Sequence, residues 1–259
     1  GNIDAEKTRA TAAEQTLQGN IDAEKTRATA AEQTLQGNID AEKSRAEGAE
    51  QTLQAGLHYI NLAKFVHDVN NINDDFAKAC TAALNENKAL FIPNGDYYHS
   101  DVLTVPANLT VVGESWNAIF HGTSVDKQAI VLNDNVCISN LSLQNAQSTR
   151  SSDDITVGLL VKGNYVNVNK VYIDKTNSAG IKVNHSKGTH IENCLIKNTL
   201  ADGIHFTDAC DTCYAVNNSL YNIGDDAISA VGYKKNASCC KNMYFINNYV
   251  NTNEARALT

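Results

Sequence analysis

The sequence has 259 residues, of which 42% are hydrophobic, so one large domain or two smaller ones with a substantial core are expected. The 29 acidic residues outnumber the 21 basic ones, and the net charge of -8 argues against nucleic acid or an anionic membrane as a partner. Apolar runs are only a few residues long, which argues against membrane insertion, and seven cysteines in a chain of this length do not indicate a disulfide scaffold.

A repeat of 18 residues opens the chain. Residues 1–18 and 19–36 are identical, and residues 37–54 are a third copy with three changes. The apolar positions follow one another in steps of 7, 7 and 4, which keeps them on one face of a nearly straight helix. These positions are Ile3, Ala10, Leu17, Ile21, Ala28, Leu35, Ile39, Ala46 and Leu53.

This narrow apolar face predicts an α-helical coiled-coil stalk over residues 1–54, about 80 Å long at roughly 1.5 Å per residue. Glu6 and Arg9 are spaced to pair on the exposed face. Two alternatives stay open. Gly19 and Gly37 each cost about 1 kcal/mol inside a helix, so each Gly-Asn pair could end one helix and cap the next. The repeat could also be a polar low-complexity linker.

Residues 55–100 are expected to hold a linker, a capping helix and a first strand. Apolar residues at helical spacing predict an amphipathic helix over 74–84, begun by Asp74. Residues 89–92 predict a short strand, closed by a turn over residues 93–96.

Beyond residue 100, two sets of short apolar segments recur every 22 to 30 residues. Regular recurrence of this length indicates a solenoid whose coils pair only with their neighbours, so we predict an all-β parallel β-helix over residues 101–259 that continues past Thr259. A β-sandwich would give no reason for the segments to align over five repeats. One set begins at residues 138, 168, 191, 216 and 246, and the other at residues 129, 158, 180, 203 and 227.

The alignment of the second set predicts both a core stack and a surface site. Leu159, Ile181, Ile204 and Ile228 share one register and should lie one above another in the core. Asp202 and Asp226 occupy equal positions before their strands, so they should be neighbours on the outer surface, at roughly the 4.8 Å strand spacing, with Asp225 beside them. Because like charges repel at this distance, we expect one of these carboxyl groups to have a raised pKa.

Three cationic or titratable residues join this site in the same register. His205 should lie over Lys182 and under Ser229 with all three side chains outward, and Arg256 should lie above Asp226. We expect His205, Lys182 and Arg256 to bind substrate. Alternatively the aspartates only hydrogen-bond turn amides, and His205 is an ordinary surface residue of a strand.

The segment INLAKF…NDDFAKACTAAL…LFIPNGDYY, residues 60–98, resembles the opening of the pectate-lyase-like β-helix proteins. This resemblance covers about residues 57–259 and implies a right-handed parallel β-helix whose N-terminal end is covered by a helix. A helical stalk followed by such a β-helix is similar to bacteriophage tailspikes and tail fibres, which are trimers that bind, and often cleave, bacterial surface polysaccharide.

The stretch ADGIHF…NIGDDAIS, residues 201–229, also resembles the polygalacturonases. The resemblance implies that Asp202, Asp225 and Asp226 hold the general acid and the water-activating base of an inverting hydrolysis. Leu200-Ala201 replaces the family's Asn-Thr, and Ala255-Arg256-Ala257 replaces its Gly-His-Gly. An arginine beside carboxylates is also similar to the polysaccharide lyases.

We predict no cofactor and no metal site. Cys210, Cys213, Cys239 and Cys240 fall in turns of successive coils, but their spacing matches no established zinc motif. Asp153-Asp154 is a candidate only for weak cation binding, and Lys234-Lys235 is expected to be a solvated turn.

These features together predict a receptor-binding tail fibre or tailspike, located in the virion tail, that engages and can depolymerise a host surface polysaccharide. Hydrolysis is favoured over elimination. The expected partners are two further copies in a homotrimer, the host glycan, and other tail or baseplate proteins. A non-enzymatic structural or adhesive fibre segment and a bacterial polysaccharide-degrading enzyme remain as alternatives.

Overall fold

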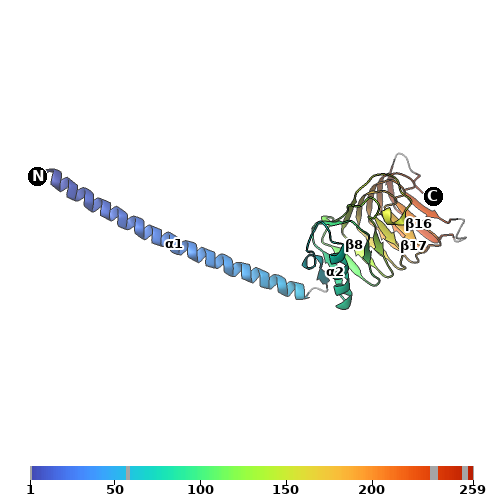
Figure 1. Ribbon diagram of the computed structural model, residues 1–259, viewed down its shortest axis with the longest axis horizontal. Coiled ribbons are helices and arrows are strands. Elements are labelled where there is room, and N and C mark those ends of the chain that lie inside the picture. Colours follow the sequence, from blue (N-terminus) through green and yellow to red (C-terminus); the bar gives the residue numbers. More distant parts are fainter. Residues whose placement is uncertain (1, 57–58, 234–238, 253–255, 259) are drawn as a thin grey trace. The chain divides into compact units, whose positions relative to one another are not determined.

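The computed structural model describes residues 2–56, 59–233, 239–252 and 256–258, with side chains described outside residues 41 and 44–56. The chain divides into two compact units, Gly1–Leu57 and His58–Thr259. The first unit is a helix, and the second is a stack of β-strand coils with a short helix at its N-terminal end (Figure 1). No helix in the described part of the chain is both long and apolar enough to cross a membrane.

The repeats form one uninterrupted helix, α1 (Asn2–Gly56). The predicted helix is therefore confirmed, and the alternative in which each Gly-Asn pair ends a helix is wrong. Gly19 and Gly37 lie inside α1, where good helix formers on both sides outweigh the cost of each glycine. The predicted pair of Arg9 and Glu6 is present, with 2.5 Å between Nη2 and Oε1, and Arg27 and Glu24 repeat it.

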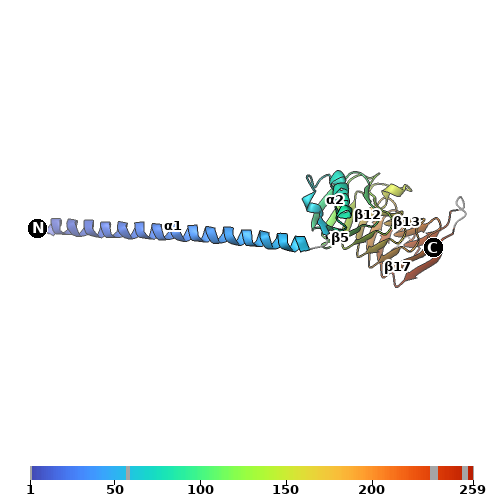
Figure 2. The ribbon, with the colours of Figure 1, turned by 90° about the horizontal axis from the view of Figure 1, so that it is seen from below.

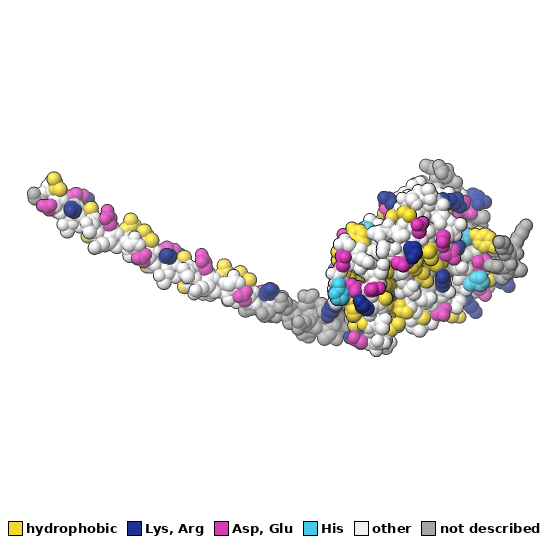
Figure 3. All heavy atoms as spheres, viewed as in Figure 1, with side chains coloured by type: hydrophobic (Ala, Val, Ile, Leu, Met, Phe, Trp, Pro, Cys, Tyr) yellow, Lys and Arg dark blue, Asp and Glu magenta, His cyan; other side chains and the backbone are white. Residues whose placement is uncertain are grey.

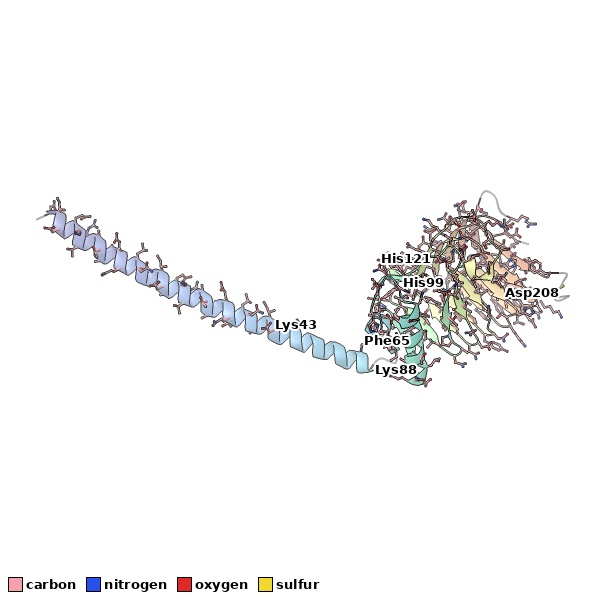
Figure 4. The ribbon with its side chains drawn as sticks, in the orientation of Figure 1. Lys43, Phe65, Lys88, His99, His121 and Asp208 are labelled. Carbon is pink, nitrogen blue, oxygen red and sulfur yellow. The ribbon has the colours of Figure 1, made fainter. Side chains whose placement is uncertain are left out.

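The apolar seam of α1 is open to solvent in the single chain. Ile3 is 83% exposed, and Leu17 and Leu35 are each 61% exposed. Hydrophobic side chains gather in separate patches along the helix (Figure 3). The side chains that are drawn on the helix point away from its axis into solvent (Figure 4). The association of this seam with other copies stays a prediction, and Ala46 and Leu53 lie outside the residues whose side chains are described.

The strands of the second unit form three parallel sheets (Figures 1 and 2), and each of the six coils from β2 to β19 contributes one strand to each sheet. The eight-stranded sheet contains β1 (Tyr59–Asn61), β2 (Ala89–Ile92), β5 (Thr110–Gly113), β8 (Cys137–Ser139), β11 (Asn167–Asn169), β14 (His190–Glu192), β17 (Asp211–Val216) and β20 (Lys241–Ile246). The seven-stranded sheet contains β3 (Gly95–His99), β6 (Ala118–Gly122), β9 (Ser142–Asn145), β12 (Tyr172–Thr176), β15 (Leu195–Thr199), β18 (Ser219–Ile223) and β21 (Tyr249–Asn251). The six-stranded sheet, which we call the cleft sheet, contains β4 (Leu103–Val105), β7 (Ile130–Leu132), β10 (Leu159–Val161), β13 (Ile181–Asn184), β16 (Ile204–Thr207) and β19 (Ile228–Val231).

The register of the cleft sheet confirms the predicted parallel β-helix and its core stack. Leu159 pairs with Ile181, Ile181 with Ile204, and Ile204 with Ile228. All four side chains are fully buried. The two segment sets seen in the sequence correspond to the eight-stranded sheet and the cleft sheet, whereas the seven-stranded sheet was not predicted.

The helix α2 (Asn73–Asn85) covers the N-terminal end of the coil stack (Figures 1 and 2). Its apolar face joins the core of the coils, and the ring of Phe76 meets that of Phe120 edge-on at 5.7 Å. The predicted helix is confirmed, but it begins at Asn73, which leaves Asp74 in the first turn rather than at the cap. Two short 3-10 turns, Leu62–Lys64 and Asp154–Thr156, complete the described helices.

The turn predicted over residues 93–96 is shorter than expected. Gly95 and Asp96 already belong to β3, where they pair with Ala118 and Ile119 of β6. The inter-coil ladder thus extends further than the turn residues suggested, because the next coil supplies a partner: the amide of Gly95 donates to the carbonyl of Asn117 at 2.8 Å.

We expect Ile204→Ala to lower the free energy of unfolding by about 2–5 kcal/mol, since it opens a cavity between Ile181 and Ile228 in the stack. Urea denaturation of the full chain measures this effect. Ile246→Ala is the matched control, because Ile246 lies in β20 and is 50% exposed. Equal losses in the two variants would show that the cleft-sheet register does not form the core.

Candidate functional site

The predicted site residues meet on the outer side of the cleft sheet because the backbone ladder continues beyond the strands. The amide of Gly180 donates to the carbonyl of Asp202, and that of Gly203 donates to the carbonyl of Asp226, each at 3.0 Å. The amide of Ala227 donates to the carbonyl of Arg256 at 2.8 Å. Asp202, Asp226 and Arg256 therefore form one row across three coils, as predicted.

The turn before Asp202 is held by local contacts. The Thr199 hydroxyl donates to the carbonyl of Ala201 at 2.7 Å, and in the preceding coil the Thr176 hydroxyl donates to Ser178 at 2.8 Å. Only glycine fits at position 203, since a Cβ there would lie 2.4 Å from Leu220 and 2.5 Å from the Ala227 carbonyl oxygen. The small residue lets the coils approach closely enough to bring their aspartates together.

The three predicted carboxylates form a compact cluster. One carboxylate oxygen from each of Asp202, Asp225 and Asp226 lies within 4.8 Å of the others. Asp202 and Asp226 are buried, whereas the side chain of Asp225 is 34% exposed. A cleft of about 510 Å³ opens over the cluster, and its lining includes Arg150, Lys182, Asp202, His205, Asp225 and Asp226.

Two arginines neutralise the adjacent pair of aspartates. Arg256 binds Asp226 in a bidentate manner, with Nε to Oδ1 at 2.7 Å and Nη2 to Oδ2 at 3.1 Å. The Nη2 of Arg150 bonds Oδ2 of Asp225. Each ion pair joins segments that are distant in sequence, and together the two arginines offset the adjacent negative charges of Asp225 and Asp226.

The third carboxylate, Asp202, is held by hydrogen-bond donors instead. Its Oδ2 lies 2.5 Å from Nδ1 of His205 and accepts the Ser229 hydroxyl at 2.6 Å. Burial acts to raise the pKa of Asp202, but the bonds from His205 and Ser229 outweigh it, and the net pKa is lowered. The raised pKa expected from like-charge repulsion is therefore wrong for Asp202, because close donors stabilise its anion.

The predicted substrate-binding residues are brought to the site with different partners. Lys182, His205 and Ser229 lie in register on β13, β16 and β19, as predicted. Lys182 and His205 line the cleft, and Lys182 bonds Asp154 at 2.5 Å. Arg256 reaches the site through Asp226 and lies outside the residues that line the cleft.

The cation sites considered from the sequence have other roles. Asp154 binds Lys182, and the Asp153 carboxylate accepts the amide of Ile155 at the start of a 3-10 turn. Cys210 and Cys213 are buried free thiols, and so is Cys194. Within the described residues, the three site aspartates alone bring ligand atoms close enough together for a metal, and two of them already bind arginines. Lys234 and Lys235 lie outside the described residues.

Arg150 is the site residue that the sequence did not indicate. It lies between β9 and β10, and 75 positions separate it from Asp225, so no coil alignment relates the two residues. The loop that carries Arg150 is tied down by the buried Asn177, whose carbonyl and side-chain oxygens accept the amides of Ser151 and Ser148. The cleft also includes Tyr233, whose ring centroid is 6.4 Å from that of His205.

The solved structures that are similar to the chain include a glucanase and two phage proteins. The catalytic unit of an α-1,3-glucanase of family GH87 from Streptomyces thermodiastaticus has a TM-score of 0.64 at 17% identity, over 77% of this chain and 42% of its own. ORF18 of Geobacillus virus E2 has a TM-score of 0.58 at 13% identity, over 79% of this chain and 44% of its own. The pre-mature gene product 12 of bacteriophage phi29 has a TM-score of 0.55 at 15% identity, over 74% and 32%.

The chain spans less than half the length of each of these proteins, and at such identities the likeness shows the fold alone. No curated protein matches the sequence. The family model for rhamnogalacturonase A/epimerase, pectate lyase-like, matches residues 67–257, which include the coils and every aspartate of the site. The pectate-lyase-like resemblance read from the sequence is thereby confirmed, and the chain belongs to the rhamnogalacturonase A/epimerase, pectate lyase-like family.

Proposed function

We propose that this chain is a receptor-binding part of a phage tail fibre or tailspike, carried on the virion tail, that binds and hydrolyses a host surface polysaccharide. The observation that carries the proposal is the cluster of Asp202, Asp225 and Asp226, with carboxylate oxygens within 4.8 Å of one another in one cleft. Glycoside hydrolysis needs a carboxyl group that donates a proton and another that activates water, and such a cluster supplies both.

The environments of the aspartates suggest how the roles divide. Asp202 has a lowered pKa and suits the base that takes a proton from water. Asp225 has the most exposed side chain of the three, so a glycosidic oxygen in the cleft reaches it most readily. To act as the acid, Asp225 must first leave its ion pair with Arg150 and take up a proton from solvent. Asp226 is fixed by its two bonds to Arg256 and can orient the water or a sugar hydroxyl.

Sugar binding falls to the polar side chains around the carboxylates. Lys182 and His205 line the cleft and can form hydrogen bonds with sugar hydroxyl groups, and the ring of Tyr233 offers a surface for a sugar face. Arg256 is 69% exposed on its side chain and keeps N–H groups for a sugar that extends past Asp226.

The comparisons support this proposal without deciding it. The similar structures include glucanases in complex with tetrasaccharides and with nigerose, three of them with an aspartate replaced by alanine. They also include two phage proteins. The second candidate, a non-enzymatic adhesive fibre, is favoured by the Arg150–Asp225 and Arg256–Asp226 ion pairs, which would serve as staples between segments.

We also propose a homotrimer whose stalk is built from α1. In this division residues 1–54 are the stalk, residues 55–100 link it to the coils and cap them, and residues 101–259 are the β-helix. The exposed seam supports association, because burying the apolar side chains of Ile3, Leu17 and Leu35 against other copies lowers the free energy. The number of three rests on similarity to tailspikes, and further partners would be other tail or baseplate proteins.

Sedimentation equilibrium of the full chain at micromolar concentration should give three times the monomer mass. Leu17→Asp with Leu35→Asp should shift it toward monomer, because each places a charge in the seam. The control is Thr8→Asp with Thr26→Asp, which adds the same charge at residues that belong to the repeat but not to the seam and should leave the trimer mass unchanged. A monomeric wild-type chain would refute the stalk.

Asp202→Asn and Asp226→Asn should each abolish cleavage of the host glycan while leaving folding and glycan binding largely intact. Asparagine keeps the size of aspartate, but at position 202 it cannot take the proton from water, and at position 226 it lacks the charge that holds Arg256 and the carboxylate that orients the water. Reducing ends released from purified host polysaccharide measure this. Asp126→Asn, at an exposed aspartate outside the cleft lining, is the control and should cleave normally.

The products and the melting temperature separate the alternatives. Hydrolysis leaves saturated sugars, whereas a lyase would leave an unsaturated sugar that absorbs in the near ultraviolet. If the aspartates only staple the coils, the variants should melt at lower temperature with no specific effect on turnover. Glycan binding without cleavage by the wild-type protein would favour the adhesive fibre.

A further inference from the structure

Asp202, His205 and Ser229 form a hydrogen-bonded triangle, which we call the Asp202 network. His205 Nδ1 lies 2.5 Å from Asp202 Oδ2, and Ser229 Oγ lies 2.6 Å from the same oxygen. Ser229 Oγ and His205 Nδ1 are 2.8 Å apart. All three residues are buried, and Ser229 is fully so. In a buried triangle of this size, every polar atom is hydrogen-bonded only if each proton points at one defined acceptor.

The proton positions follow from the acceptors. The ionised Asp202 carboxylate only accepts, so the Ser229 hydroxyl and the His205 Nδ1–H must both point at its Oδ2. Neutral His205 is therefore protonated on Nδ1 and carries its lone pair on Nε2. With two donors on one oxygen, the carboxylate cannot rotate without breaking both bonds.

The coil register explains why these residues meet. His205 and Ser229 each lie three positions after an aspartate of the site, and they pair with one another across β16 and β19. Ser229 thus reaches back to the aspartate of the preceding coil, 27 positions away in sequence. Within the described residues, Asp226 is held by Arg256 instead.

We propose that His205 and Ser229 are positioning residues that fix the Asp202 carboxylate, in orientation and as an anion, as the proton acceptor of the cleft. The inference rests on the proposed hydrolysis and assigns within it a role that the aspartates alone leave open. His205 then acts through Asp202, and Ser229, which is fully buried, does not touch the glycan.

Other charges also face Asp202, and they do not replace the network. Asp225 and Asp226 face it from the loop before β19, and both oppose its ionisation. Lys182 on β13, Arg150 on its loop and Arg256 beyond β21 each bind another carboxylate. The two direct donors are thus the main influence that favours the anion, together with the charge of His205 when protonated and the Asp226 backbone amide.

The Asp202 network should determine the pH at which activity is lost in acid. Without the Ser229 hydroxyl, the pKa of Asp202 should rise, because burial and the neighbouring aspartates then meet one donor fewer. A base works only when ionised, so the acid limb of the kcat/KM profile should move to higher pH by the same amount.

The direct test needs no glycan. Full-length protein labelled with carbon-13 at the aspartate side-chain carboxyl is titrated by NMR, and the Asp202 signal is the one missing from Asp202→Asn. Ser229→Ala and His205→Ala should each raise its titration midpoint. Ser229→Thr and His205→Asn, which restore a hydroxyl or an N–H donor, should return it toward the wild-type value.

Ser186→Ala is the matched control for the loss of a buried hydroxyl. Ser186 is buried and bonds the Gly163 carbonyl at 2.6 Å, away from the cleft lining, so its loss should leave the Asp202 midpoint unchanged. An unchanged midpoint in both Ser229→Ala and His205→Ala would overturn the proposal.

The kinetic test uses the host glycan that the protein cleaves. In Ser229→Ala the acid limb should move to higher pH, with kcat/KM down roughly tenfold or more near the wild-type limb, while Ser186→Ala keeps the wild-type profile. A raised midpoint with an unmoved acid limb would show that Asp202 is not the base and would overturn the proposal. If no host glycan is cleaved, the proposed function fails, and the NMR titration still decides whether the network holds Asp202 as an anion.

Discussion

The in-register stacking of parallel coils is the constraint on which the rest of the second unit depends. The backbone groups of each strand find their partners in the coils on either side, so the position of one strand residue fixes the positions of its neighbours along the strand. The same register puts Ile204 and Ile228 inside and, two residues earlier, Asp202 and Asp226 outside. The core and the candidate site are thus two faces of one ladder, and a shift of one residue would destroy both.

This regularity explains how much the sequence could predict. A one-dimensional repeat converts equal sequence positions into neighbours, which was enough for the core stack and for the row that ends in Arg256. The seven-stranded sheet was not predicted because its strands, such as Leu195–Thr199, mix apolar residues with lysine and asparagine and lack a recurring pattern. Arg150 was not predicted because it lies on a loop outside the repeat, where tertiary contacts alone determine which residue it binds.

Electrostatics show the limit of reasoning from charge spacing alone. Three carboxylates at this distance suggest repulsion and a raised pKa, yet each aspartate has its own counterpart. Arg150 and Arg256 offset two of the charges, and the third is stabilised by the donors His205 and Ser229. Three neighbouring carboxylates require cations or hydrogen-bond donors that offset their repulsion. Which side chains supply them depends on distances that a sequence does not contain.

A crystal structure of the chain carrying Asp202→Asn, soaked with an oligosaccharide of the host polysaccharide, would show whether the cleft holds the substrate. We expect an intact sugar chain in the cleft, with a glycosidic oxygen within hydrogen-bond distance of Asp225 and a water molecule beside residue 202. A sugar chain bound on another face of the coils, with the Arg150–Asp225 and Arg256–Asp226 pairs undisturbed and the cleft without sugar, would contradict it.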